Sequence, residues 1–238
     1  MALIYTAVLI WFYMTFWYLL SVFKKRNDIA DVAWGLGFIL VTIFNLLSNS
    51  SFKLIISLFL ISIWGLRLAT HIYNRNKNKK EDYRYDQFKK SPYFKVFITQ
   101  GFFMWLICWP IIFSQENLNW LNFLGIFIWL IGFYFEVTAD NQLKKFINNP
   151  NNKGKIMQSG LWAYSRHPNY FGEVTMWWGI WLINFNSNWW AIIGPLTITF
   201  LILKVSGVPL LEKKYEGNLE FENYKKRVSV FIPLRPKN

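Results

Sequence analysis

Residues 163–173, AYSRHPNYFGE, gather several polar side chains in front of a Trp-rich apolar run. Pro168 suits an early helical position, because its ring fixes φ and the N–H that it lacks is unpaired there anyway. A helix beginning there places Asn169 and Glu173 on one face, four residues apart. Free N–H groups at a helix N-terminus beside Arg166 suit a phosphate, and the Glu173 carboxylate accepts hydrogen bonds from a ribose or an amide. The stretch therefore predicts a cofactor site; the alternative is that Pro168 and Glu173 merely begin a helix.

A second group of charges ends the apolar run at 120–139. Glu136, Asp140 and Lys144 are spaced i, i+4 and i+8, so one helical face carries charge from the membrane edge into the cytoplasm. Ionisable side chains inside a span are costly and usually face the interior of a bundle, which indicates a functional site. The alternative is a stripe of snorkelling side chains with internal ion pairs.

The first half of the chain holds another acid, Asp31, just inside an apolar run at 29–48. Asp31 either belongs to a functional site or forms a buried structural ion pair with Arg67. Arg67 shares a helical face with His71. One Cys and two His argue against a structural zinc site or an iron–sulfur cluster, and no metal is expected. Walker A, G-x-S-x-G and H-E-x-x-H motifs are absent from the sequence.

The elements that carry these residues are apolar helices. The chain is 54% hydrophobic and 21% aromatic, which is typical of a membrane protein. Runs long enough to span a bilayer predict about seven transmembrane helices, with six or eight as alternatives, at roughly 2–23, 29–48, 52–72, 96–113, 120–139, 172–186 and 189–211. We predict an all-α integral membrane protein with one polytopic domain, 1–238, whose first span is retained and not a cleaved signal peptide.

Charge predicts the orientation of these spans. If the spans alternate, segments 24–28, 73–95, 140–171 and 212–238 lie on one side and carry 23 of the 26 Lys and Arg residues. The positive-inside rule then places the N-terminus outside and the C-terminus in the cytoplasm. Topology and anionic headgroups explain the net charge of +13, so a nucleic-acid partner is not needed. The tail after residue 211 is expected to be an interfacial amphipathic segment or a lid over the cytoplasmic face.

Several stretches together resemble a known family. SGLWAYSRHPNYFGE, DNQLKKF and FENYKKRVSVFIP, with DVAWGLGF, WGLRLATHI and EDYRYDQF in the first half, are similar to a bacterial branch of the steroid 5-alpha-reductase superfamily. That branch is a domain of unknown function related to the C-terminal domain of 3-oxo-5-alpha-steroid 4-dehydrogenase. The resemblance implies a seven-helix reductase of the bacterial inner membrane, with a cytoplasmic NADPH pocket formed by motifs in 120–238 and a lipid-like, steroid-like or enone substrate.

The resemblance also implies roles for individual residues. The residues that match cofactor-holding positions are Asp140, Lys144, Arg166, His167, Asn169, Tyr170, Glu173, Tyr215 (paired with Lys214) and Tyr224. In the steroid reductases a Glu and a Tyr of the N-terminal half bind the substrate carbonyl. The catalytic candidates for that role here are Asp31, Tyr83 and Tyr85, with Glu81 as a further acid.

Two other functions stay open from the sequence. The Arg-His-Pro-x-Tyr-x-Gly motif also resembles that of isoprenylcysteine carboxyl and phospholipid methyltransferases. In that hypothesis the cofactor is S-adenosylmethionine, whose carboxylate meets Arg166 or His167 and whose amine meets Glu173. The third hypothesis is a non-enzymatic membrane scaffold. The full PNYFGE and the upstream stripe from Asp140 to Lys144 favour the reductase.

Overall fold

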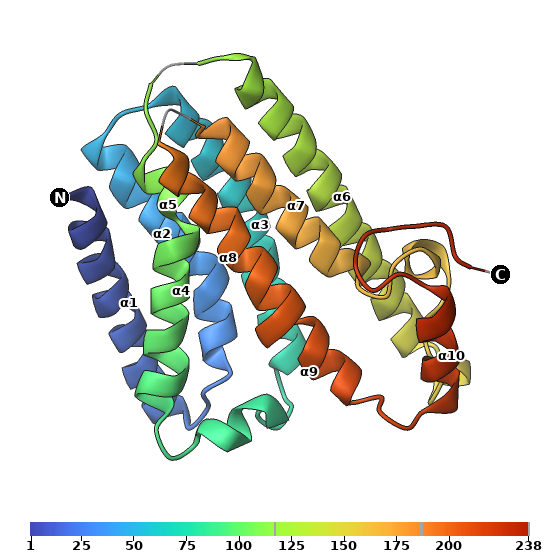
Figure 1. The fold of residues 1–238 in the computed structure, drawn as a ribbon. Coiled ribbons are helices and arrows are strands. Elements are labelled where there is room, and N and C mark those ends of the chain that lie inside the picture. Colours follow the sequence, from blue (N-terminus) through green and yellow to red (C-terminus); the bar gives the residue numbers. More distant parts are fainter. Residues whose placement is uncertain (117, 186–187, 238) are drawn as a thin grey trace. The chain divides into compact units, whose positions relative to one another are not determined.

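The computed structural model describes residues 1–116, 118–185 and 188–237, apart from the side chain of Tyr83. The described residues fold as helices joined by short connections (Figure 1). Five helices are long and apolar enough to cross a membrane: α1 (Ala2–Lys24), α2 (Ile29–Ser48), α3 (Phe52–Asn76), α6 (Trp120–Asn148) and the run Trp189–Lys213. The predicted all-α membrane fold is confirmed. The count of seven stays a prediction, because Tyr93–Ile107 and α7 (Pro168–Ile183) are shorter.

The chain divides into two compact units. The first unit comprises Met1–Asn122 and Ile183–Gly194, and the second comprises Phe123–Leu182 and Pro195–Asn238. Each unit is described by itself, and the single domain that we expected stays a prediction.

In the first unit, α2 and α3 cross at glycines. A Cβ on Gly35 would lie 2.7 Å from the carbonyl oxygen of Gly65, so the two backbones are in contact. Small residues allow membrane helices to approach this closely. A π-helical turn (Tyr93–Ile98) leads into α4 (Thr99–Ile107), and the helix breaks at Cys108 before the short α5 (Trp109–Ile112). Pro110 accounts for the break, because it removes a helical N–H and its ring crowds the preceding turn.

In the second unit, α6 continues nine residues past its predicted end at 139, about 13 Å at the rise of an α-helix. Helix α7 begins at Pro168, as predicted. A Cβ on Gly172 would lie 2.5 Å from the Gly132 carbonyl oxygen, so α7 packs directly on α6. The chain ends with α8 (Ile193–Phe200), a π-helical turn (Leu201–Val205), α9 (Val208–Lys213), α10 (Leu219–Arg227) and a tail that bends back toward the end of α10.

Candidate functional site

The pair Asp140 and Asn169 joins α6 to the first turn of α7. Asn169 Nδ2 donates a hydrogen bond of 3.1 Å to Asp140 Oδ1. The other polar atom of the amide, Asn169 Oδ1, is buried and has no hydrogen-bond partner among the described residues. Buried acceptors are nearly always paired in folded proteins, so this oxygen lacks a donor that the described residues do not supply.

The other predicted residues of this region lie on the same two helices. Lys144 is exposed, one turn beyond Asp140 on α6, whereas Glu136 is buried one turn before it. Glu173 is half-buried, one turn along α7 from Asn169. The Tyr170 ring stacks on the His167 imidazole with 5.8 Å between ring centroids. The structure thus brings the charged stripe of α6 and the polar start of α7 to one end of this helix pair.

Arg166 and His167 are bonded to a carboxylate that the sequence did not single out. Arg166 Nε donates to Glu212 Oε1 at 2.8 Å, and His167 Nε2 lies 3.1 Å from the same oxygen. Arg166 Nη1 also donates to the carbonyl oxygens of Lys225, in the last turn of α10, and of Val228, directly after α10. The Arg166 side chain is only 9% exposed. Its role as a cofactor ligand stays a prediction, and what the structure shows is a guanidinium that holds α9 and α10 to the start of α7.

The two predicted tyrosines of the C-terminal segment differ in burial. Tyr224 is buried, its hydroxyl donates to the Trp162 carbonyl oxygen, and burial raises the pKa of the phenol. Tyr215 is partly exposed, its ring packs 5.0 Å from that of Phe221, and Lys214 Nζ lies 6.0 Å from the centre of the Tyr215 ring. Tyr224 therefore fixes α10 to the loop before α7, while Tyr215 stays accessible.

The first unit contains a compact acid cluster. The Tyr85 hydroxyl donates a hydrogen bond of 2.6 Å to Asp31 Oδ1, and Arg84 Nη2 donates to Asp31 Oδ2 at 3.0 Å. Arg84 also bonds to Asp82 through Nε and Nη2. Burial, followed by the charge of Asp31 and the hydrogen bond to it, raises the pKa of Tyr85 well above its ordinary value. Two of the three catalytic candidates are thus in contact; the side chain of the third, Tyr83, lies outside the described residues.

Sequence reasoning missed Arg84 as the partner of Asp31. The available signal was EDYRYDQF itself, where an arginine stands between two tyrosines after an acidic pair. Nearby, Arg26 forms a two-point ion pair with the buried Asp28, whose Oδ2 also accepts from Asn76 Nδ2. Glu81, the further candidate acid, accepts from the Asn27 backbone N–H. These bonds hold the loop after α3 against the start of α2.

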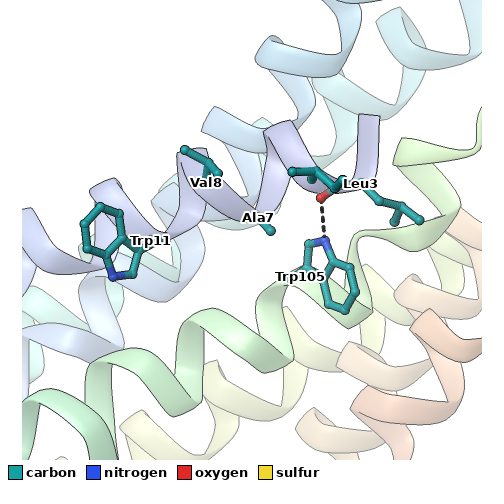
Figure 2. A pocket seen from close by; sticks show the side chains of 6 residues that line it. Leu3, Ala7, Val8, Trp11 and Trp105 are labelled. Carbon is teal, nitrogen blue, oxygen red and sulfur yellow. Dashed lines mark hydrogen bonds between the residues drawn. The ribbon is translucent and has the colours of Figure 1, made fainter. Parts of the chain in front are cut away.

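Each unit also has a shallow hollow. In the second unit a hollow of about 330 Å³ is lined by Gln142, Lys145, Phe146, Met157, Ser159 and Gly160. At 100° per residue, its α6 residues lie on roughly the opposite side of the helix from Asp140, so the predicted cofactor pocket stays a prediction. In the first unit an apolar hollow of about 320 Å³ lies between α1 and α4, where Trp105 Nε1 donates to the Leu3 carbonyl oxygen (Figure 2).

Comparison with known proteins gives partial matches. A profile described as "Protein of unknown function (DUF1295)" matches residues 17–228. The 3-oxo-5-alpha-steroid 4-dehydrogenase 1 of Bos taurus is 32% identical over 111 residues, 46% of this chain and 40% of that protein. The Homo sapiens protein of the same name is 30% identical over 113 residues, covering 47% and 40%. Steroid 5-alpha-reductase DET2 of Gossypium hirsutum is 35% identical over 68 residues, covering 28% and 26%. The matched region thus spans 40% or less of these relatives, and no solved structure matches significantly.

Proposed function

Because the profile match covers most of the chain, this protein belongs to the DUF1295 family, and we propose that it is a membrane-embedded reductase. Its substrate is a lipid-like molecule with a carbon–carbon double bond activated by a carbonyl, and its cofactor is NADPH taken from the cytoplasm. Similarity to the steroid reductases supports the reaction class. The observation in this chain that carries the proposal is the buried, unpaired oxygen of Asn169 beside Asp140.

The residues present fit a nicotinamide dinucleotide. Asn169 Oδ1 is an acceptor that suits the N–H of a carboxamide or the hydroxyl of a ribose. Asp140 orients that amide by accepting from its Nδ2. Lys144 is exposed one turn away and would meet a phosphate, and the Glu173 carboxylate would accept from a further hydroxyl. We assign Tyr215 to the accessible rim, and Arg166, His167 and Tyr224 to holding the surrounding backbone.

When bound, NADPH supplies a hydride to the β-carbon of the enone, while a proton adds at the α-carbon, so the double bond becomes a single bond. The protein must hold a proton donor where negative charge develops on the carbonyl oxygen. The proposal keeps as donors the candidates of the sequence analysis, Asp31, Tyr83 and Tyr85. Asp31 and Tyr85 are hydrogen-bonded to each other in the first unit, where Arg84 balances the charge of the carboxylate.

The methyltransferase hypothesis receives less support from these contacts. It requires Arg166 or His167 to meet the carboxylate of S-adenosylmethionine, and both side chains bond to Glu212 instead. A scaffold needs no cofactor, so none of the three ligands tested below should stabilise its folded state. Both alternatives are separated from the proposal by the following experiment.

The test is a thermal-shift titration of the detergent-purified protein with NADPH, NADH and S-adenosylmethionine. Binding to the folded state stabilises it by about 2.7 kcal/mol at a hundredfold excess over Kd. We expect a saturable shift with NADPH that Asn169→Leu abolishes. The matched control is Asn141→Ala, an exposed position of α6 next to Asp140, which should keep the full shift.

A shift with S-adenosylmethionine alone would establish methyl transfer, and no shift with any ligand would support the scaffold. An NADPH shift that survives Asn169→Leu would remove this asparagine from the cofactor site. If the NADPH shift behaves as expected, consumption of NADPH with a panel of unsaturated lipid ketones then identifies the substrate class.

A further inference from the structure

The tail after α10 lies against the segment that precedes α7. We call residues 228–237 the C-terminal strap. Ser165 and Ser229 form a parallel β-bridge, in which the Arg166 N–H donates to the Ser229 carbonyl oxygen at 2.9 Å. Ser165 Oγ donates to the Phe231 carbonyl oxygen at 2.7 Å, and the Leu234 N–H donates to that of Tyr164 at 3.0 Å. The Lys237 N–H also donates to the Arg227 carbonyl oxygen at 2.9 Å, so the strap is a loop that returns to the end of α10 and is held by backbone hydrogen bonds.

The strap exposes apolar side chains. Val228 is buried, whereas Val230 is 39% exposed and Ile232 and Leu234 are each 57% exposed. Tyr164, bonded to the strap at Leu234, is also exposed. We call Val230, Ile232, Leu234 and Tyr164 the apolar ridge, which the described residues leave uncovered.

The ridge is flanked by positive charge. Between residues 225 and 237 the sequence has five cations and no Asp or Glu: Lys225, Lys226, Arg227, Arg235 and Lys237. The nearest acids of α10 already have partners, since Glu220 accepts from Gln158 and Glu222 pairs with Lys225. Arg227 donates to Gln158. Lys225 is thus paired with Glu222, and an uncovered apolar ridge beside the other four cations complements an anionic bilayer surface.

The length of α7 places the strap near that surface. Its 16 residues span about 24 Å, less than the roughly 30 Å of a bilayer's hydrocarbon core. As the sixth predicted span, α7 would therefore have its first turn at the hydrocarbon boundary. The strap is bonded to Ser165, three residues before Pro168, so it lies at the depth of the lipid headgroups.

We propose that the C-terminal strap binds the anionic membrane surface, with Ile232 and Leu234 inserted below the headgroups and Arg235 and Lys237 on lipid phosphates. The inference is independent of the proposed reductase activity.

The experiment uses the full chain in nanodiscs made of phosphatidylcholine alone or with added phosphatidylglycerol. Ile232→Cys carries an environment-sensitive fluorophore, and Asn151→Cys, in an exposed loop of the same unit, is the matched control. Wild-type protein, whose single Cys108 is buried, gives the background labelling. In phosphatidylglycerol discs we expect blue-shifted emission at residue 232, quenched by spin-labelled lipid and reversed by salt, and water-like emission at residue 151.

Replacing both Arg235 and Lys237 by Gln should weaken partition of the reporter about 30-fold, at about 1 kcal/mol for each cation near an anionic surface. If Ile232→Cys does not fold, Val230→Cys reports on the same ridge. Emission at the strap as water-like as at residue 151 in phosphatidylglycerol discs would overturn the proposal. Equal insertion in phosphatidylcholine alone, without effect of salt, would overturn the role of the anionic surface.

Discussion

A single carboxylate oxygen, Glu212 Oε1, is the hydrogen-bond partner of both Arg166 and His167. Arg166 also donates to the carbonyl oxygens of Lys225 in α10 and of Val228 directly after it. A guanidinium with these bonds is committed to the fold, since turning toward a ligand would break all of them. The residue of this motif with free hydrogen-bonding capacity is Asn169, through its buried oxygen.

Because of Tyr85, we expect the first unit to lose stability at alkaline pH. The pKa of its phenol is raised in the folded protein, chiefly by burial and then by Asp31. In the unfolded chain it titrates near pKa 10, so its contribution to stability is fully present below about pH 10 and is lost as the pH rises further. We expect the Tm of wild type to fall more steeply than that of Tyr85→Phe between about pH 9 and pH 11.

The measurement is Tm against pH for both proteins in one detergent. Parallel curves would contradict the buried, carboxylate-bonded phenol. Tyr215→Phe, which changes a partly exposed tyrosine in the other unit, is the control and should run parallel to wild type.

At the scale of elements, close helix contact at glycine positions the candidate cofactor residues. The contact of Gly172 with Gly132 brings the first turn of α7 beside Asp140. In Gly172→Ala the added Cβ would meet the Glu136 backbone nitrogen at 2.5 Å, and backbone cannot yield as a side chain can. We expect a loss of about 1–3 kcal/mol in stability, together with a weaker NADPH shift.

Thermal unfolding with and without NADPH checks this expectation. Gly101→Ala is the matched control, because its Cβ would meet the flexible Met14 side chain at 3.1 Å. A Gly172→Ala protein as stable as the control would show that α6 and α7 can separate without loss.

The sequence predicted the elements better than their contacts. Apolar runs gave the long helices, and the fixed φ of proline located the start of α7 at Pro168. Periodicity also placed Asn169 and Asp140 on faces suited to chemistry. The Asp31–Arg84 and Arg166–Glu212 pairs were missed, because they join residues 53 and 46 positions apart and only the folded backbone decides such distances. The tail was expected to be an interfacial segment or a lid, but its backbone hydrogen bonds to Tyr164, Arg166 and Arg227 have no pattern in the sequence that predicts them.

At the scale of the whole molecule, the distribution of Lys and Arg sets the orientation. With 23 of 26 basic residues in four segments, the C-terminus should be cytoplasmic and the N-terminus outside. A fluorescent protein that matures only in the cytoplasm should be bright when fused to the C-terminus and dark when fused to the N-terminus. A phosphatase that is active only in the periplasm should be inactive at the C-terminus and active at the N-terminus. A dark C-terminal fusion in a well-expressed protein would invert the topology and remove the cytoplasmic cofactor site.

The bonding of Arg166 and His167 to Glu212 bears on how the Arg-His-Pro sequence is interpreted. Arg166 and His167 hold α9 and the end of α10 to the start of α7, so these contacts do not depend on which cofactor the protein binds. An Arg-His-Pro sequence is therefore a signature of folding and does not by itself identify a reaction. Under the proposed function, the residue after that proline and its partner one helix earlier identify the reaction, here Asn169 and Asp140.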